Sequence, residues 1–255
     1  MRSKITAAAL ATMLVLGVVA CGDDDSSDEA TSESSGETTT TTEAGLGTEA
    51  CDAVLGVGTA LTNGPDGPPT TEYLEGEFLP AVDAVVATGA AELTGPATEL
   101  QAAAQAAIDG EVIDEDVVFG LYGELAAATH TACGYEAVDV SAVDYAFVDL
   151  PTTLPAGTTS FALANDGDEP HEMVLFRRAD GETRPIEDIL ALGEEEAGSA
   201  ITFTGVTFAQ PGQTGYVATE LEPGGYATVC FLPVGGGEDG PPHFTEGMVA
   251  EFEVT

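Results

Sequence analysis

The chain has 255 residues, of which 45 are acidic, 5 are Lys or Arg and 3 are His, so its formal net charge is −40 at pH 7. Two of the basic residues, Arg2 and Lys4, lie in the first 21 residues, and the rest of the chain contains only Arg177, Arg178 and Arg184. So few cations exclude a nucleic-acid partner and polybasic contact with an anionic membrane. The acidity is compatible with docking to a partner that presents a basic surface, and equally with a solvated surface suited to a saline habitat.

Residues 1–21 carry the features of an export signal. Two cations precede an apolar run at 5–20 that is too short to span a membrane comfortably, and small residues lead to Cys21. This pattern predicts a signal peptide rather than a transmembrane helix. Residues 18–21 (Val-Val-Ala-Cys) resemble a bacterial lipobox. The resemblance implies that Cys21 is lipid-modified and anchors the protein in the cell envelope, at the outer face of the cytoplasmic membrane.

Residues 22–47 are acidic, rich in Ser and Thr and almost free of apolar side chains. Such a segment buries too little surface to offset its ordering entropy, so we expect a disordered tether. Export also permits disulfides, because extracytoplasmic compartments are oxidising.

Residues 48–137 are predicted to be helical. Apolar side chains recur there at spacings of three and four, which is typical of helices that bury one stripe. Four such stripes are separated by Gly- and Pro-rich breaks, and together they predict a four-helix bundle with up-down-up-down topology. The stripes are Cys51, Val54, Leu55, Gly58 and Leu61; Leu74, Phe78, Val82 and Val85; Leu100, Ala104 and Ala107; and Val118, Leu121, Leu125, Ala128 and Ala132.

In that topology the first helix begins at the end of the bundle where the fourth helix finishes. Cys51 and Cys133 fall at these two positions, so we predict a disulfide between them. His130, one turn before Cys133, has no third ligand nearby for a metal site. We expect it to be a surface histidine beside the disulfide.

Residues 138–255 change to a period of two, which predicts strands. The alternating apolar residues include Val143, Tyr145 and Phe147, and turn sequences separate the runs as in a β-sandwich. An insertion at 177–198 contains a short apolar helix pattern and all three arginines of the mature chain. We expect these arginines to form internal ion pairs with carboxylates. The fold class expected for the whole chain is therefore α+β multidomain, a helical bundle followed by an antiparallel sandwich.

One cysteine remains after Cys21 is assigned to lipid and Cys51 is paired with Cys133. It is Cys230, an unpaired thiol in an exported protein, which calls for a functional reason. The sandwich also contains His171, His243 and Met248. Two imidazoles, one thiolate and one thioether are the donor set of a mononuclear blue-copper site.

At this point the sequence resembles the cupredoxins, the plastocyanin and azurin superfamily, over about residues 138–255. The residues that carry the resemblance are Asn165, Gly167, His171, Met173 and Val174 around the first histidine, and Cys230, Phe231, Pro233, His243, Gly247 and Met248 near the carboxyl terminus. It implies a cupredoxin-like sandwich with one type 1 copper, held by His171, Cys230 and His243 with Met248 as the weak axial ligand. Met173 is a second candidate for the axial position.

Two features depart from the family pattern. Twelve residues separate Cys230 from His243, where cupredoxins usually have about two to four. We expect the intervening Gly-rich segment to loop out and return, because lengthening a flexible loop costs only about 0.6 kcal/mol per doubling. The residue after the first histidine is Glu172, where the family commonly has an Asn that ties the two ligand loops together.

The leading functional hypothesis is one-electron transfer between redox partners rather than catalysis. Four protein ligands leave no open position for a substrate, and two sandwich histidines are too few for a trinuclear copper cluster or a three-histidine zinc site. Two alternatives remain at this stage. One is a copper-free cupredoxin-like binding lipoprotein, and the other is a copper storage or delivery protein with a more exposed site.

Overall fold

The computed structural model describes residues 45–65, 67–237 and 240–255. The predicted signal peptide, the lipobox with Cys21 and nearly all of the predicted tether lie outside the described residues. The described helices and strands belong to one compact unit. None of the helices in this described part combines the length and the apolar character needed to cross a membrane.

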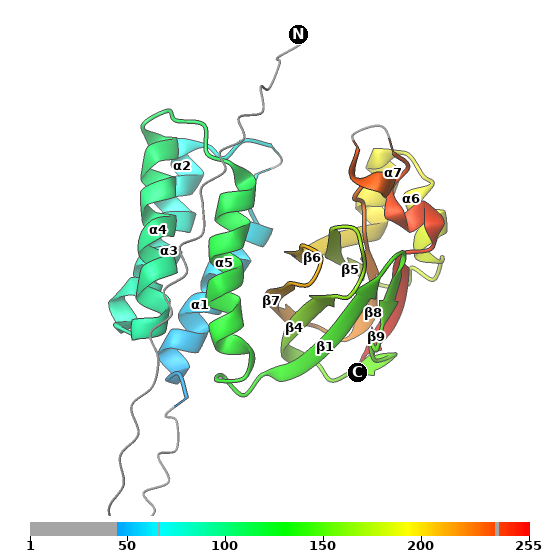
Figure 1. Cartoon of the computed structure of the whole chain (residues 1–255), viewed down its shortest axis with the longest axis horizontal. Helices are drawn as coiled ribbons and strands as arrows, with labels where there is room; N and C mark the ends of the chain where they lie inside the picture. Colours follow the sequence, from blue (N-terminus) through cyan, green and yellow to red (C-terminus); the bar gives the residue numbers. More distant parts are fainter. Residues whose placement is uncertain (1–44, 66, 238–239) are drawn as a thin grey trace, which may run out of the picture. The chain divides into compact units, whose positions relative to one another are not determined.

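The amino-terminal half of this unit is helical (Figure 1). α1 packs against α3, α3 against α4, α4 against α5, and α5 against α1. The second helical segment contains a π-helical stretch, η1, between α2 and α3, and it ends at Gly89 in the left-handed conformation that glycine adopts readily. The bounds are α1 (Thr48–Thr62), α2 (Thr71–Tyr73), η1 (Leu74–Phe78), α3 (Leu79–Thr88), α4 (Ala91–Ile108) and α5 (Glu115–His130).

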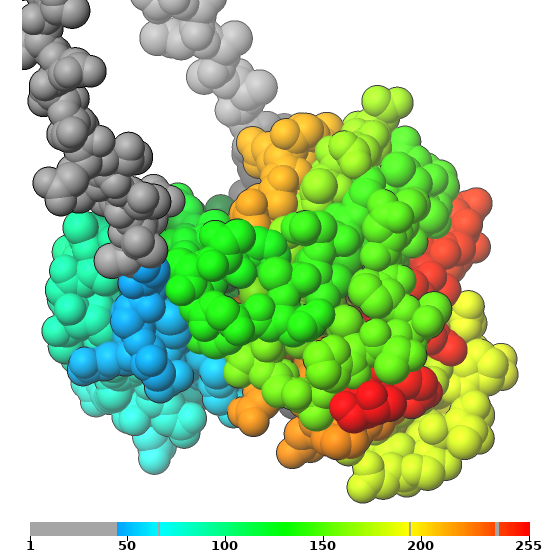
Figure 2. Space-filling model, turned by 90° about the horizontal axis from the view of Figure 1, so that it is seen from below, coloured from blue at the N-terminus to red at the C-terminus, as the bar shows by residue number. Residues whose placement is uncertain are grey.

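The carboxyl-terminal half is a sandwich of two sheets. The first sheet has the order β2-β1-β4-β7 and the second the order β3-β9-β8-β5-β6. Figure 2 shows the last strand, in red, beside the green segment that contains β2 and β3. The first sheet contains β1 (Glu136–Val143), β2 (Ala146–Val148), β4 (Gly157–Asn165) and β7 (Thr214–Leu221). The second contains β3 (Thr153–Leu154), β5 (His171–Arg178), β6 (Ile201–Ala209), β8 (Gly224–Val229) and β9 (Val249–Val254).

The expectation of a purely antiparallel sandwich is wrong, because two strand pairs are parallel. β1 runs parallel to β4, and β3 runs parallel to β9. The chain passes from β2 in the first sheet to β3 in the second and back to β4. These crossings allow neighbouring strands to run in the same direction, which a two-residue hairpin cannot do.

The insertion between β5 and β6 contains two short helices, α6 (Ile186–Leu190) and α7 (Glu194–Ala200). The predicted ion pairs of the three arginines are present. Arg177 pairs with Asp180 at 2.9 Å, Arg178 pairs with Glu251, and Arg184 pairs with Glu182 at 2.6 Å. All the arginines of the described part are therefore engaged with carboxylates of this chain.

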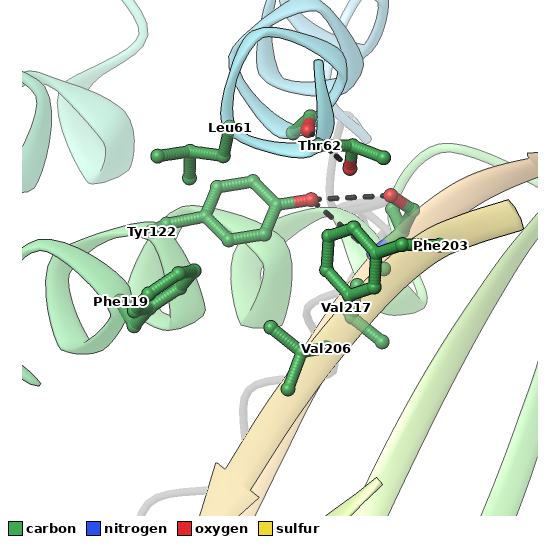
Figure 3. A pocket seen from close by; sticks show the side chains of 10 residues that line it. Leu61, Thr62, Phe119, Tyr122, Phe203, Val206 and Val217 are labelled. Atoms are coloured by element: carbon green, nitrogen blue, oxygen red, sulfur yellow. Dashed lines mark hydrogen bonds between the residues drawn. The ribbon is translucent and has the colours of Figure 1, made fainter. Parts of the chain in front are cut away.

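The helices pack against β7, the edge strand of the first sheet, and one hydrophobic core continues from them into the sandwich. Tyr122 of α5 is the central contact: its hydroxyl donates to the Ala218 carbonyl at 3.1 Å and accepts from the Ala218 amide at 3.4 Å (Figure 3). Gly58 of α1 leaves room for the phenol, because a Cβ there would overlap the Tyr122 hydroxyl. Burial raises the pKa of Tyr122 to about 12.

The predicted disulfide is confirmed: Cys51 and Cys133 are bonded, with their Cα atoms 5.7 Å apart. The expectation that His130 is a surface residue is wrong. His130 is buried where α5 meets the sandwich, with Nδ1 at 2.9 Å from the Ser160 hydroxyl and Nε2 at 3.3 Å from Asp139. The helical pattern of α5 showed no sign of the strands that cover this residue.

Candidate metal centre

The loop that leads into β5 is shaped by Asn165, at the end of β4. Its buried side chain accepts from the Gly167 amide at 2.9 Å and donates to the carbonyls of Glu169 and Ala209 at 2.8 Å each. Such side chain to backbone bonds are the means by which Asn stabilises tight turns. The loop therefore presents Glu169 and His171 in a fixed arrangement at one end of the sandwich.

Cys230 follows β8 and is fully buried. We call the described residues that follow, 233–237 and 240–242, the excursion. Its ends lie side by side, because Pro233 and Pro242 form a bridge and the Val234 amide donates to the Pro241 carbonyl at 2.9 Å. The predicted looping out of this segment thus has a structural basis: the length of the excursion does not separate its two ends.

The returning chain places His243 beside Cys230. The His243 amide donates to the Leu232 carbonyl at 2.8 Å, and the next amide, that of Phe244, donates to the Cys230 carbonyl at 2.9 Å. Met248 is tied to both ligands through its backbone: its amide donates to the His243 carbonyl at 3.1 Å, and its carbonyl accepts from the Cys230 amide at 3.2 Å. Met248 and Met173 are both fully buried.

Three ligand atoms from distant parts of the sequence converge in this region. His171 Nδ1 lies 3.2 Å from His243 Nδ1, and His243 Nδ1 lies 3.4 Å from Cys230 Sγ. The three ligand atoms all lie within 4.8 Å of one another, and the three residues are buried. Histidine nitrogens about 2.0 to 2.1 Å from one metal ion, as in zinc sites, stand roughly 3.3 Å apart. The spacing therefore fits ligation of a single ion.

The outer nitrogen of each imidazole meets a carboxylate. His171 Nε2 lies 3.1 Å from Asp144 Oδ1, and His243 Nε2 lies 3.2 Å from Glu169 Oε2. A carboxylate at Nε2 favours the tautomer with the proton on that nitrogen, which leaves Nδ1 free to bind a metal. Gly167 makes space for the first pair, since a Cβ there would overlap both Asp144 and His171.

Glu169 makes two further contacts. Its Oε2 also accepts from the Gly235 amide at 2.6 Å, and its Oε1 accepts from the Tyr145 hydroxyl at 2.9 Å. These donors, the Gly235 amide first, hold the pKa of Glu169 below its usual range. The ring of Tyr145 packs edge-on against His243, with the ring centroids 5.0 Å apart.

The environment of Cys230 keeps its thiol protonated in the metal-free protein. Burial raises the pKa of Cys230 to about 11. The Glu172 amide approaches Sγ at 3.5 Å, and Glu172 Oε1 accepts from the Phe231 amide at 2.8 Å. Glu172 thus links the segment that contains His171 to the segment that contains Cys230. Because the thiolate is the metal-binding form, metal binding here must release the thiol proton.

The structure brings together His171, Cys230 and His243. The backbone of Met248 is hydrogen-bonded to the backbones of Cys230 and His243. Cys51 lies in α1 and Cys133 lies just after the end of α5, and their disulfide is not part of this cluster. Sequence reasoning missed Asp144, Glu169 and the position of Tyr145. Tyr145 was expected in a strand, but it lies in the turn between β1 and β2 with a φ of 67°.

No family model matches the sequence, and no curated protein matches it either. Several solved structures resemble about half of the chain. Auracyanin from the photosynthetic bacterium Roseiflexus castenholzii is 17% identical with a TM-score of 0.33, over 46% of this chain and 95% of that one. Auracyanin A, a blue copper protein from Chloroflexus aurantiacus, is 19% identical with a TM-score of 0.31, over 46% and 97%. A multicopper oxidase from Aquifex aeolicus is 12% identical with a TM-score of 0.28, over 48% and 30%.

The sandwich of two mixed sheets carries a buried His-Cys-His cluster at one end. Its donor set of two imidazoles and one thiol, with buried methionines in the same part of the fold, suits copper better than the hard oxygen-seeking cations. The residues present therefore fit a type 1 copper ion.

Proposed function

We propose that this protein carries single electrons between redox partners, with one type 1 copper held by His171, Cys230 and His243. Met248 is proposed as the weak axial ligand. The observation that carries the proposal is the convergence of three buried soft donors within 4.8 Å. A bound copper ion supplies the one-electron redox change, and the protein supplies its fixed surroundings.

The surroundings of the cluster suit electron transfer, because they restrain the ligands in both redox states. Carboxylates hold the outer nitrogens of both imidazoles, and Glu172 ties the Cys230 segment to β5. Ligands that cannot rearrange keep the cost of a change in oxidation state small. The ligands also leave no position for a substrate, so we propose no enzymatic activity.

Burial of the site argues against the storage or delivery alternative. Both histidines and the cysteine are fully buried, and Tyr145 and Glu169 cover His243. A metal that is handed to another protein requires an accessible ligand. The enclosed cluster therefore supports a resident ion.

The cellular setting is also part of the proposal. Lipid on Cys21 would anchor the protein at the outer face of the cytoplasmic membrane. A partner with a basic docking surface would be steered by the 45 acidic residues, which outnumber the three arginines that remain after residues 1–20 are removed. Steering of this kind predicts that electron exchange with a basic redox protein slows as the salt concentration rises. A rate that does not change with ionic strength would remove the basic partner from the proposal.

Copper loading of the exported part of the chain, made without residues 1–21, tests the main proposal. Addition of Cu(II) should give one bound copper and an intense blue or green colour, because a copper–thiolate bond produces strong visible charge transfer. Cys230→Ser should abolish the colour. A protein that stays colourless with its thiol reduced and copper in excess would support a copper-free binding domain instead.

A further inference from the structure

Glu169 stands at the meeting point of three segments that the sequence separates widely. It lies in the loop before β5, and its carboxylate contacts His243 after the excursion, Gly235 within the excursion and Tyr145 in the turn between β1 and β2. Its side chain is about one-fifth exposed, at 22%. Among the hydrogen bonds of the described side chains, those of Glu169 alone join the excursion to a cluster histidine.

The cysteine and the second histidine are twelve residues apart, so backbone connection alone does not orient the imidazole. Backbone hydrogen bonds place the His243 main chain, and Nδ1 of its ring faces His171 and Cys230. On the outer side of the ring, two contacts restrain rotation about the side-chain bonds. One is the 3.2 Å approach of Nε2 to Glu169, and the other is the edge of the Tyr145 ring. The Tyr145 hydroxyl is itself held by Glu169 at 2.9 Å. Both restraints therefore depend on one carboxylate.

From this geometry we propose that Glu169 is a positioning residue of the copper centre, which fixes Nδ1 of His243 as the ligand atom and biases the site toward Cu(II). The proposal rests on the proposed function. A carboxylate bonded to the outer nitrogen makes the imidazole a stronger donor, and its negative charge stabilises the more highly charged ion. Glu169 thus has two separable effects: its shape orients His243, and its charge lowers the reduction potential.

Two substitutions separate these effects. Glu169→Gln keeps an oxygen for His243 Nε2 but removes the charge, whereas Glu169→Ala removes both. Asp168→Asn is the matched control, because Asp168 is the preceding residue, is exposed, and contacts the site only through its backbone amide, which donates to Asp144. The measurements are the visible spectrum, Cu(II) affinity and reduction potential of the copper-loaded protein.

Glu169→Gln should retain the spectrum while the preference for Cu(II) over Cu(I) falls about tenfold, which raises a one-electron potential by about 59 mV. Glu169→Ala should bind Cu(II) about 10- to 100-fold more weakly and give an altered spectrum. Asp168→Asn should change the visible spectrum, the Cu(II) affinity and the reduction potential very little. Equal shifts in Glu169→Gln and Asp168→Asn would overturn the proposal, as would an unaltered spectrum and affinity in Glu169→Ala.

A measurement without copper keeps this inference separate from the proposed function. In the metal-free protein, nitrogen NMR of His243 at neutral pH should show the proton on Nε2 in the unsubstituted chain and in Glu169→Gln, and a mixture of tautomers in Glu169→Ala. A proton on Nδ1 in the unsubstituted chain would refute the positioning role. A protein with the expected tautomer that never turns blue would instead refute the electron-transfer function and the proposed bias toward Cu(II).

Discussion

Tyr122 should stabilise the junction between the helices and β7, and Tyr122→Phe isolates its hydroxyl. The substitution keeps the ring and removes both hydrogen bonds to Ala218, at 3.1 and 3.4 Å. Loss of a buried hydrogen bond that leaves its partner unsatisfied costs about 1 to 3 kcal/mol. We therefore expect the free energy of unfolding at pH 7 to fall by that amount, measured by urea denaturation of the metal-free protein.

The same variant should respond differently to alkali. Burial raises the pKa of Tyr122 from 10.0 to about 12, so the folded state disfavours the ionised phenol. The stability due to the neutral phenol is complete below pH 10 and is lost as the pH rises toward 12. Between pH 9 and pH 11 the unsubstituted protein should lose about 1 kcal/mol of stability that Tyr122→Phe keeps, so the difference in stability between the two proteins narrows.

Tyr216→Phe is the control, since Tyr216 is only partly buried and contacts His130 through its ring, which the substitution keeps. It should change the stability by less than about 0.5 kcal/mol at every pH. If Tyr122→Phe costs no more than this control, and the difference from the unsubstituted protein stays constant up to pH 11, then the phenol is not held at the junction as described.

Three further predictions concern the disulfide and the metal centre. Replacing Cys51 and Cys133 together by Ala should lower the free energy of unfolding by about 4.5 kcal/mol, from the chain-entropy relation for a separation of 82 residues, and leave the copper colour intact; calorimetry and the visible spectrum check this. The raised pKa of Cys230 in the folded state, from 9.0 to about 11, should cost the metal-free protein a few kcal/mol as the pH rises through that window, and Cys230→Ser should not show this loss in alkaline denaturation. Met248→Leu should keep copper and shift the reduction potential, whereas Met173→Leu should leave it unchanged; the reverse result in voltammetry would assign the axial position to Met173.

The parts of the site that sequence reasoning found are those with rare residues. A chain with 3 histidines and 4 cysteines restricts any soft-metal cluster to few combinations, so His171, Cys230 and His243 could be singled out. Asp144 and Glu169 could not, because two carboxylates among 45 acidic residues carry no distinguishing signal. Their roles depend on the three-dimensional approach to Nε2 of each histidine.

The fold shows the same division between local and non-local information. The helical stripes and the short helix at Ile186–Leu190 follow from local spacing. The parallel pairing of β1 with β4 depends on where the chain changes sheets, and the left-handed turn at Tyr145 interrupts an alternating pattern that reads as a strand. The burial of His130 likewise depends on strands that follow it in sequence.

The helical segment has a consequence for how the sandwich behaves in isolation. β7 is the last strand of its sheet, and the main-chain groups of Ala218 are bonded to Tyr122 rather than left free. A sandwich produced without the helices would expose this strand edge together with the apolar side chains that face α1 and α5, and such an edge can recruit strands from other molecules. The helices therefore protect the sandwich against self-association at the strand edge. The carboxylate-rich surface alone would do this poorly at high salt, where charge repulsion is screened.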